Sequence, residues 1–263
     1  MNTAGRFGNG RGILKTVTAT MVALGAAGAL ALAWPGGPTS AEADTPAATP
    51  AATPTATHRP AVRPVDPSIV HASDRPGRSL NVTIDDGPDP VWTPKVLEVL
   101  ERHHVKAVFC MIGPQAAAHP DLVRRVVAAG HRLCDHTISH DTGMDHRPER
   151  YQSDQILPAQ RMIEKAGGAP VRYYRAPGGA FTPYSRALAA RHGMRPLGWN
   201  IDSKDFEGGS VATIEATVRS ELTNGPTVLF HDGGGDRSRT VEALDRLLPS
   251  LRQQGYGFGF PQH

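Results

Sequence analysis

Two histidines stand four residues apart in the segment Asp135-His136-Thr137-Ile138-Ser139-His140-Asp141. Imidazole nitrogens are common ligands of divalent metals. If the chain makes a helical turn here, residues at i and i+4 lie on one face and both rings can point at one centre. Two solvated surface histidines are the alternative, because the chain has 12 of them. A metal site would need further ligands from elsewhere in the sequence.

Other ionisable or Gly/Pro-rich clusters follow segments that read as strands. In parallel α/β folds the chemistry collects at the carboxyl ends of the strands. Five of the seven strand ends predicted below carry such clusters, which favours one shared site over scattered surface residues. The clusters are Asp85-Asp86-Gly87-Pro88, the His136 and His140 segment, Arg175-Ala176-Pro177-Gly178-Gly179, Asp202 with Asp205, and His231-Asp232.

Strand-like and helix-like segments alternate from residue 79 to the end of the chain. This alternation implies parallel strands joined by helical crossovers. The length of 79–263 favours one barrel-like α/β domain that is smaller than a regular eightfold barrel, with an open doubly wound sheet as the alternative. Strands are predicted at 80–84, 105–112, 132–134, 171–175, 196–201, 227–230 and 256–260, and helices at 93–104, 120–130, 148–167, 183–192, 211–222 and 240–254.

The first 78 residues differ from this pattern. Three basic residues precede an apolar run at 16–34, and Ala41-Glu42-Ala43 follows it. That order predicts a secretory signal peptide over residues 1–43. A retained N-terminal anchor is the alternative, because the run approaches the length of a membrane span. Residues 44–78 are rich in Pro, Thr and Ala and predict a disordered linker, either a tether through a cell wall or a plain spacer.

The net charge of +3 is concentrated in the N-terminal segments. Residues 1–78 hold seven Lys or Arg and four Asp or Glu, which leaves 21 basic and 21 acidic residues in 79–263. The predicted domain is therefore formally neutral. We expect no nucleic-acid partner, since the overall charge balance of the domain does not argue for one.

The two cysteines, Cys110 and Cys134, both fall in predicted strands. A compartment outside the cytoplasm would permit a disulfide, provided that the two Cβ atoms face each other. Two buried free thiols are the other possibility and the one that we favour from the sequence. No CxxC pair is present, so neither cysteine is predicted to bind zinc.

Five motifs together resemble a known family. They are TIDDGP, HTISH, RAPGG, WNIDSKDF and LFH, in this order over residues 79–263. The set is similar to the motifs of polysaccharide deacetylases, the NodB-homology domain of carbohydrate esterase family four. The resemblance implies a single catalytic domain folded as a distorted (β/α)7 barrel, and metal-dependent removal of N-acetyl, or sometimes O-acetyl, groups from glycans.

The resemblance also assigns roles to residues. Asp86, His136 and His140 match the metal ligands, and this His2Asp set suits zinc and cobalt alike. Asp85 matches the catalytic base, which takes a proton from the attacking water, and Arg175 matches the arginine that holds this base ionised and oriented. The segment after residue 135 is expected to make the helical turn described above.

The remaining motif residues match the acid and the substrate-binding surface. His231 matches the general acid and Asp205 its carboxylate partner. The backbone N–H of Gly178, where many relatives have Tyr, is expected to face the oxyanion. Phe206 stands where the family usually has Trp, so the pocket keeps an aromatic face but loses an indole N–H. The further substrate-binding candidates are Pro177, Trp199, Leu229 and Asp202, the last with a purely structural alternative.

We therefore predict a secreted, monomeric, metal-dependent deacetylase of an acetylated polysaccharide or oligosaccharide such as peptidoglycan or chitin oligosaccharide. Insertion in a membrane is expected only if the N-terminal signal is retained. An acetylxylan esterase is the alternative substrate class. An amidohydrolase of small cyclic amides and a non-catalytic glycan-binding module are weaker alternatives. The secretory start argues against the first of these, and the presence of a complete ligand, base and acid set argues against the second.

Overall fold

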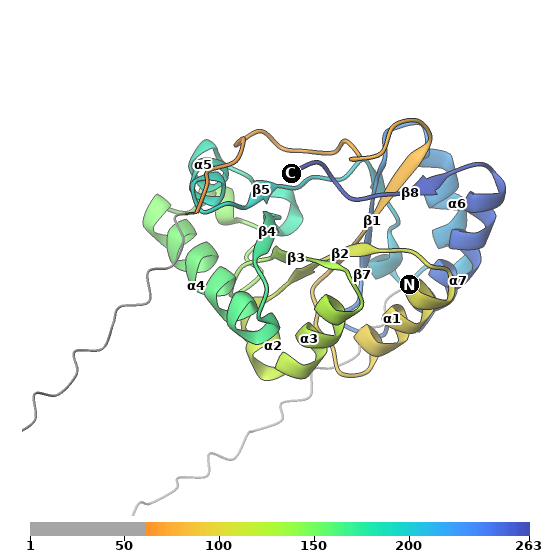
Figure 1. Cartoon of the computed structure of the whole chain (residues 1–263), viewed down its shortest axis with the longest axis horizontal. Coiled ribbons are helices and arrows are strands. Elements are labelled where there is room, and N and C mark those ends of the chain that lie inside the picture. The colour runs from red at the N-terminus through yellow and green to blue at the C-terminus, as the bar shows by residue number, and fades with distance from the viewer. Residues whose placement is uncertain (1–61) are drawn as a thin grey trace, which may run out of the picture. The chain divides into compact units, whose positions relative to one another are not determined.

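The computed structural model describes residues 62–263 (Figure 1), and the description below concerns these residues. The predicted signal peptide or anchor at 1–43 and the linker segment 44–61 lie outside them. Within the described part of the chain, no helix is long and apolar enough to cross a membrane.

The chain alternates strands and helices, as the sequence predicts. The strands are β1 Ser79–Asp85, β2 Ala107–Met111, β3 Arg132–Asp135, β4 Val171–Tyr174, β5 Arg195–Pro196, β6 Ile201–Asp202, β7 Thr227–His231 and β8 Gly257–Phe258. The helices are α1 Trp92–Arg102, α2 Gly113–Ala118, α3 Pro120–Ala128, α4 Glu149–Gly167, α5 Pro183–Arg191, α6 Val211–Glu221 and α7 Ser238–Gln253, with short 3-10 turns η1 Met144–His146, η2 Pro177–Gly179 and η3 Asp205–Glu207.

The strands form a parallel sheet in the order β5-β4-β3-β2-β1-β7-β6, with β8 paired to β1 beside this path. The helices pack around the sheet in Figure 1, so its strands are covered. All residues of β1 and β2 are buried, as expected for parallel strands enclosed by crossover helices. The predicted distorted α/β barrel is confirmed as a parallel half-barrel with seven helices in the described residues.

The predicted strand at 196–201 is wrong in one respect. The structure has two short strands there, β5 and β6, which pair with β4 and β7 at opposite ends of the sheet order. The residues between β5 and β6 extend both pairings. Leu197 N–H donates to Tyr174 O of β4 at 2.8 Å, and Asn200 N–H donates to Thr227 O of β7 at 2.9 Å. One chain segment thus spans the gap that hydrogen-bonded strands would close in a complete barrel.

Helices α5 and α6 begin at residues whose side chains accept hydrogen bonds from free N–H groups of the first turn. Thr182 accepts from Ser185 N–H at the start of α5, and Ser185 Oγ accepts from Thr182 N–H in return, so the two residues form a capping box. Helix α4 ends at Gly168, whose φ of 64° is the left-handed conformation that glycine adopts without a Cβ clash. Helix α2 was not predicted, because its six residues are too short to show a helical period.

The domain begins earlier than the sequence predicts. Residues 62–78 were predicted to belong to the disordered linker, yet Val70 is buried and forms a β-bridge with Leu197. Val65 N–H donates to Ala190 O at 3.0 Å, so this segment also follows α5. Short apolar residues among prolines gave no periodic signal, and the pairing surface exists only in the folded domain.

Cys110 and Cys134 form a disulfide. They are direct neighbours across β2 and β3, where the register pairs one with the other. The preference for two free thiols is therefore wrong. Sequence places both residues in strands, but only the register of those strands brings the two Cβ atoms face to face.

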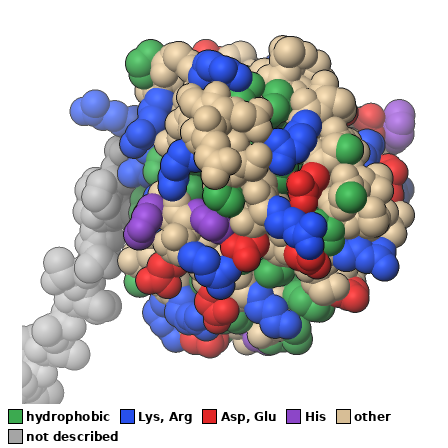
Figure 2. Space-filling model, turned by 90° about the vertical axis from the view of Figure 1, so that its right-hand side faces the viewer, with side chains coloured by type: hydrophobic (Ala, Val, Ile, Leu, Met, Phe, Trp, Pro, Cys, Tyr) green, Lys and Arg blue, Asp and Glu red, His purple; other side chains and the backbone are tan. Residues whose placement is uncertain are grey.

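The charge of the described domain is mixed. On the face shown in Figure 2, Lys and Arg side chains alternate with Asp and Glu over much of the surface. This distribution agrees with the formal neutrality of residues 79–263.

Candidate metal centre and active site

A pocket of about 380 Å³ lies at the carboxyl ends of the strands. It gathers ten of the thirteen residues that the sequence nominates, from segments as far apart in the chain as 85 and 231. Its lining consists of Asp85, Asp86, His136, His140, Thr142, Ala176, Gly178, Trp199, Asp202, Phe206, Leu229 and His231. Arg175 and Asp205 stand directly behind this lining and contact Asp85 and His231.

Asp85 and Asp86 leave β1 in different directions. Asp85 is the last residue of β1 and pairs in register with Cys110 and His231 on the two flanking strands. Asp86 follows with a φ of 77°, a left-handed conformation that is uncommon for a non-glycine residue and is found at functional sites. This reversal lets two neighbouring carboxylates face different partners.

Gly87 makes this turn possible. A Cβ at this position would overlap the carboxylate of Asp232, which is buried behind the turn. Asp232 in turn accepts a hydrogen bond from Thr93 Oγ1 at 2.5 Å, and burial raises its pKa to about 7. The Asp-Asp-Gly sequence therefore packs on the buried carboxyl group of Asp232, which the sequence places in a strand-end cluster without a role.

Asp86, His136 and His140 bring one potential ligand atom each to a common point. The three atoms lie within 4.8 Å of one another. Asp86 Oδ1 is 3.5 Å from His136 Nε2 and 3.2 Å from His140 Nε2. This oxygen is buried and has no hydrogen-bond partner among the described residues. A buried carboxylate oxygen without a donor is costly, so the group fits a bound cation.

The hydrogen bonding and burial of His136 favour a neutral imidazole with Nε2 unprotonated, which is the form that binds a metal. Its Nδ1 lies 2.8 Å from the carbonyl oxygen of Arg175, so that nitrogen carries the proton and Nε2 is left to face Asp86. Burial lowers the pKa of His136 to about 3, which keeps the ring neutral. Metal-binding histidines commonly donate their second nitrogen in this way, which fixes the tautomer and the ring orientation.

The expected helical turn at 136–140 is absent from the structure. The segment is a bend in which Thr137 and His140 have φ values of 71° and 53°. Asp135 Oδ1 accepts from Thr137 N–H at 2.7 Å, and Thr137 Oγ1 accepts from His140 N–H at 3.2 Å. These local bonds compete with helix formation. The two rings therefore converge through a polar loop rather than through helical spacing.

Asp85 is held by Arg175 at the base of the pocket. Arg175 Nη1 donates to Asp85 Oδ1 at 2.7 Å, and both side chains are almost fully buried. Burial raises the pKa of Asp85, while the charge of Arg175 opposes that rise. Arg175 is itself fixed by three further acceptors, namely Thr83 Oγ1 and the carbonyl oxygens of Leu197 and Gly198. The carboxylate thus has one fixed oxygen and one that faces the pocket.

His231 ends β7, next to Asp85 on β1, and is paired with Asp205. His231 Nδ1 donates to Asp205 Oδ1 at 2.7 Å, which leaves Nε2 for the pocket. Burial alone would lower the pKa of His231, but the hydrogen bond and charge of Asp205 outweigh it and raise the pKa. Asp205 also accepts from the His231 N–H and from Thr240 Oγ1, so its orientation is fixed.

The apolar lining comes from three residues named by the sequence. Leu229 is buried on β7, and Trp199 lies in the segment between β5 and β6. Phe206 is 48% exposed and its ring meets that of His231 edge-on at 5.2 Å between centroids. An aromatic side chain exposed at the mouth of a polar pocket offers a contact surface for the face of a sugar ring.

Gly178 lines the pocket, whereas Pro177 is buried and is not part of the lining. Gly178 has a φ of 59°, and a Cβ there would approach Thr142 to 3.3 Å. Asp202 lines the pocket too, but its carboxylate accepts from Lys204 N–H at 3.1 Å and forms an ion pair with Lys204 Nζ at 3.2 Å. Both the structural and the substrate-contact interpretation of Asp202 therefore remain predictions.

Thr142 and Ala176 complete the lining and were not predicted. Ala176 lies inside the RAPGG motif, so its place beside Arg175 could have been inferred. Thr142 follows His140 by two residues, but the loop that returns it to the pocket has no periodic pattern to indicate its direction. Thr83, which accepts from Arg175, could have been found by the alternation of side chains along β1.

The fold and this arrangement define a polysaccharide deacetylase-like site, and comparisons with known proteins agree. The family model described as polysaccharide deacetylase matches residues 72–197. A peptidoglycan-N-acetylglucosamine deacetylase of Bacillus cereus is 37% identical over 68% of this chain and 84% of the relative. A chitooligosaccharide deacetylase of Bradyrhizobium is 38% identical over 68% of this chain and 87% of the relative. The chain belongs to the polysaccharide deacetylase family.

Solved structures share the fold. A peptidoglycan N-acetylglucosamine deacetylase bound to an N-hydroxybenzamide compound matches with a TM-score of 0.67 and 28% identity, over 73% of this chain and 89% of that chain. A family 4 acetyl xylan esterase of Clostridium thermocellum, in complex with a cobalt ion, matches with a TM-score of 0.62 and 28% identity, over 69% of this chain and 87% of that chain.

Proposed function

We propose that this protein is a secreted, metal-dependent deacetylase that hydrolyses the N-acetyl groups of a glycan containing N-acetylglucosamine, such as peptidoglycan or a chitin oligosaccharide. The observation that carries the proposal is the placement of Asp85 and His231, which are neighbours on β1 and β7, in one pocket with the Asp86, His136 and His140 group. The names of the similar bacterial deacetylases support this substrate class.

Asp86, His136 and His140 would hold a divalent metal. The orphaned Oδ1 of Asp86 and the neutral His136 fit such an ion, and the donor set suits zinc or cobalt. A metal in this place supplies Lewis acidity to the acetyl oxygen and lowers the pKa of water. Three protein ligands leave coordination positions free for both.

Asp85 is proposed as the base. One of its oxygens is fixed by Arg175, and the other faces the ligand group, 3.5 Å from His136 Nε2. A carboxylate next to the attacking water can accept its proton as the water adds to the acetyl carbon. Burial raises the pKa of Asp85 and so increases its basicity, while the Arg175 charge favours the ionised form.

His231 is proposed as the acid. Deacetylation expels an amine, which is a poor leaving group unless its nitrogen is protonated. The hydrogen bond and charge of Asp205 raise the pKa of His231 and so favour the protonated imidazole, and the bond at Nδ1 leaves Nε2 for the pocket. The Gly178 backbone N–H is proposed to face the oxyanion, with Trp199, Leu229, Phe206 and Asp202 around the sugar and Pro177 supporting the loop.

The cellular setting follows from the N-terminal sequence. A signal peptide at 1–43 would export the chain, and the Pro/Thr/Ala-rich linker would separate the domain from any retained anchor. A monomer would suffice for this chemistry, because one chain supplies all of the proposed ligand, base and acid residues. The proposed location is therefore outside the cytoplasm, at the cell wall or free in the medium.

Acetate release tests this function. The full chain would be supplied with peptidoglycan, chitin oligosaccharides and acetylated xylan, with and without a chelator, followed by restored zinc or cobalt. We expect release from the first two, loss on chelation and recovery with metal. Release from xylan alone would assign the alternative acetylxylan esterase activity. No release from any substrate with metal present would contradict a catalytic role.

A further inference from the structure

A second pocket lies at the opposite end of the sheet from the candidate active site. Its volume is about 320 Å³, and its lining includes Arg75, His104, Lys106, Arg252, Phe258 and Phe260. Lys106 immediately precedes β2 and Arg75 comes shortly before β1, so the pocket lies at the amino ends of these strands. The seven residues of β1 separate it from Asp85 by about 20 Å.

The pocket has more positive charge than its surroundings neutralise. Asp74 is the one acidic residue in its lining, and it accepts from Phe260 N–H at 2.9 Å while it lies 3.6 Å from Arg132 Nη2. Its charge is therefore already engaged. Among the described residues, no carboxylate forms an ion pair with Arg75 or Arg252.

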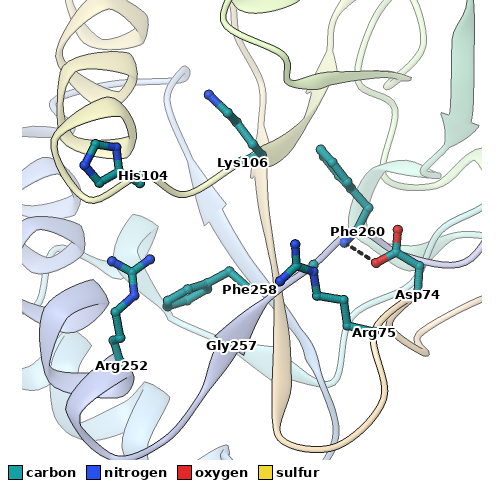
Figure 3. A pocket seen from close by; sticks show the side chains of 9 residues that line it. Asp74, Arg75, His104, Lys106, Arg252, Gly257, Phe258 and Phe260 are labelled. Atoms are coloured by element: carbon teal, nitrogen blue, oxygen red, sulfur yellow. Dashed lines mark hydrogen bonds between the residues drawn. The ribbon is translucent and has the colours of Figure 1, made fainter.

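The two free guanidinium groups flank an aromatic ring. Figure 3 shows Phe258 between the side chains of Arg75 and Arg252, with His104 near Arg252. The Arg252 guanidinium lies 5.6 Å from the centroid of the Phe258 ring. Lys106 also belongs to the lining, and its ammonium group donates one hydrogen bond to Ala129 O and keeps two further donors.

These features match a phosphate ester better than a bare anion. Guanidinium groups bind phosphate oxygens with paired N–H donors, and the partly exposed ring of Phe258 suits the carbon atoms of an attached sugar or polyol. The volume is that of a small-ligand site.

We propose that this second pocket binds a phosphate group together with its attached sugar or polyol unit, as part of a phosphodiester-linked polymer. Binding there would hold the enzyme on an anionic polymer while the site at the carboxyl ends remains open to the acetylated glycan. The proposal concerns a separate binding site and holds whether or not the proposed deacetylase function does.

The test compares two double variants of the full chain. One is Arg75→Ala with Arg252→Ala. The matched control is Arg124→Ala with Arg161→Ala, which removes the same charge from exposed positions on α3 and α4. The probe is a fluorescently labelled glycerol phosphate oligomer, and binding is read by fluorescence anisotropy. Melting temperatures check folding, and Gln replaces Ala if the Ala pair melts early.

We expect the pocket variant to bind the oligomer about 100-fold more weakly, or about tenfold for each guanidinium. The control should stay within about twofold, and acetate release by both should be unchanged. Inorganic phosphate should compete with the oligomer. Absent binding by the unaltered protein, or equal weakening in both variants, would overturn the proposal. So would binding to phosphatidylglycerol vesicles that depends on the pocket while the oligomer does not bind.

Discussion

The two ends of the parallel sheet hold charge in opposite ways. At the carboxyl end, Asp85 and Arg175 are only 2% and 0% exposed and hold each other at 2.7 Å. At the amino end, Arg75 and Arg252 are exposed and have no carboxylate partner among the described residues. Burial of an unpaired charge costs several kcal/mol, whereas an exposed one is solvated.

This difference separates two kinds of site. Buried, paired charges have one geometry, which proton transfer requires because the reacting atoms must stay within hydrogen-bond reach. Exposed, unpaired cations can adapt to a ligand, but they cannot fix a transition state. The predictions below test whether each end behaves in the way its burial indicates, and they run from the largest expected effect to the smallest.

Asp85→Asn should produce the largest effect. We expect a loss of about 10³-fold in kcat, since the proposed base is removed while Asp86, His136 and His140 keep their potential ligand atoms. Acetate release and bound metal content, measured on the same sample, distinguish loss of chemistry from loss of metal. The exposed carboxylate of Asp121 on α3 provides a control, Asp121→Asn, that should keep full activity. Turnover by Asp85→Asn at the unaltered rate would refute the assigned base.

His131 tests whether the amino end also contains a constrained group. Its Nδ1 accepts from Ala107 N–H at 3.0 Å, and burial lowers its pKa to about 4 from 6.5. Below pH 6.5, His131 becomes protonated in the unfolded chain but stays neutral in the folded chain until the pH approaches 4. Stability should therefore fall as the pH drops from 6.5 toward 4, by about 3 kcal/mol from this residue.

His131→Asn removes this titration while an amide oxygen replaces the acceptor. Urea unfolding at pH 7 and pH 4.5 should show a smaller acid-induced loss of stability in the variant than in the unaltered protein. Other groups titrate in this range, so the difference between the two proteins is the relevant quantity. An identical loss in both would show that His131 is protonated in the folded state.

Asp205→Asn should reduce activity about 10- to 100-fold near neutral pH, as loss of an orienting partner commonly does. The hydrogen bond and charge of Asp205 raise the pKa of His231, so their loss lowers it. A general acid must be protonated to act, so activity falls as the pH rises through its pKa. In the variant this fall should begin at a lower pH than in the unaltered protein. The pH profile of kcat/KM measures this. Thr240→Val, which removes one bond to Asp205, should shift the profile less; an unshifted profile in Asp205→Asn would argue against His231 as the acid.

Phe206→Trp should produce the smallest effect. Phe206 is exposed and its ring meets that of His231 edge-on. Its phenyl group can neither bind a metal nor transfer a proton. We expect a two- to fivefold change in kcat/KM, about the contribution of an added aromatic contact, with a different ratio between glycan substrates. A change of several orders of magnitude would mean that this position controls the chemistry rather than the contact surface.

Some features of the molecule can be predicted from the sequence because they depend on local patterns. Alternating apolar runs and Gly or Pro boundaries placed most helices and strands to within a few residues. Features that depend on long-range pairing were not. The division of 196–201 into β5 and β6 follows from pairing with β4 and β7. The disulfide follows from the register of β2 and β3.

The sequence by itself determined which residue types stand at the ends of the strands, and hence that two histidines, two adjacent carboxylates, an arginine and a further histidine could meet. Only the tertiary structure decided how they meet. His136 and His140 converge through a bend with left-handed residues, and Asp86 turns away from Asp85 over Gly87. Such conformations are strained in isolation and persist because the packed strands and the buried Asp232 and Arg175 fix them.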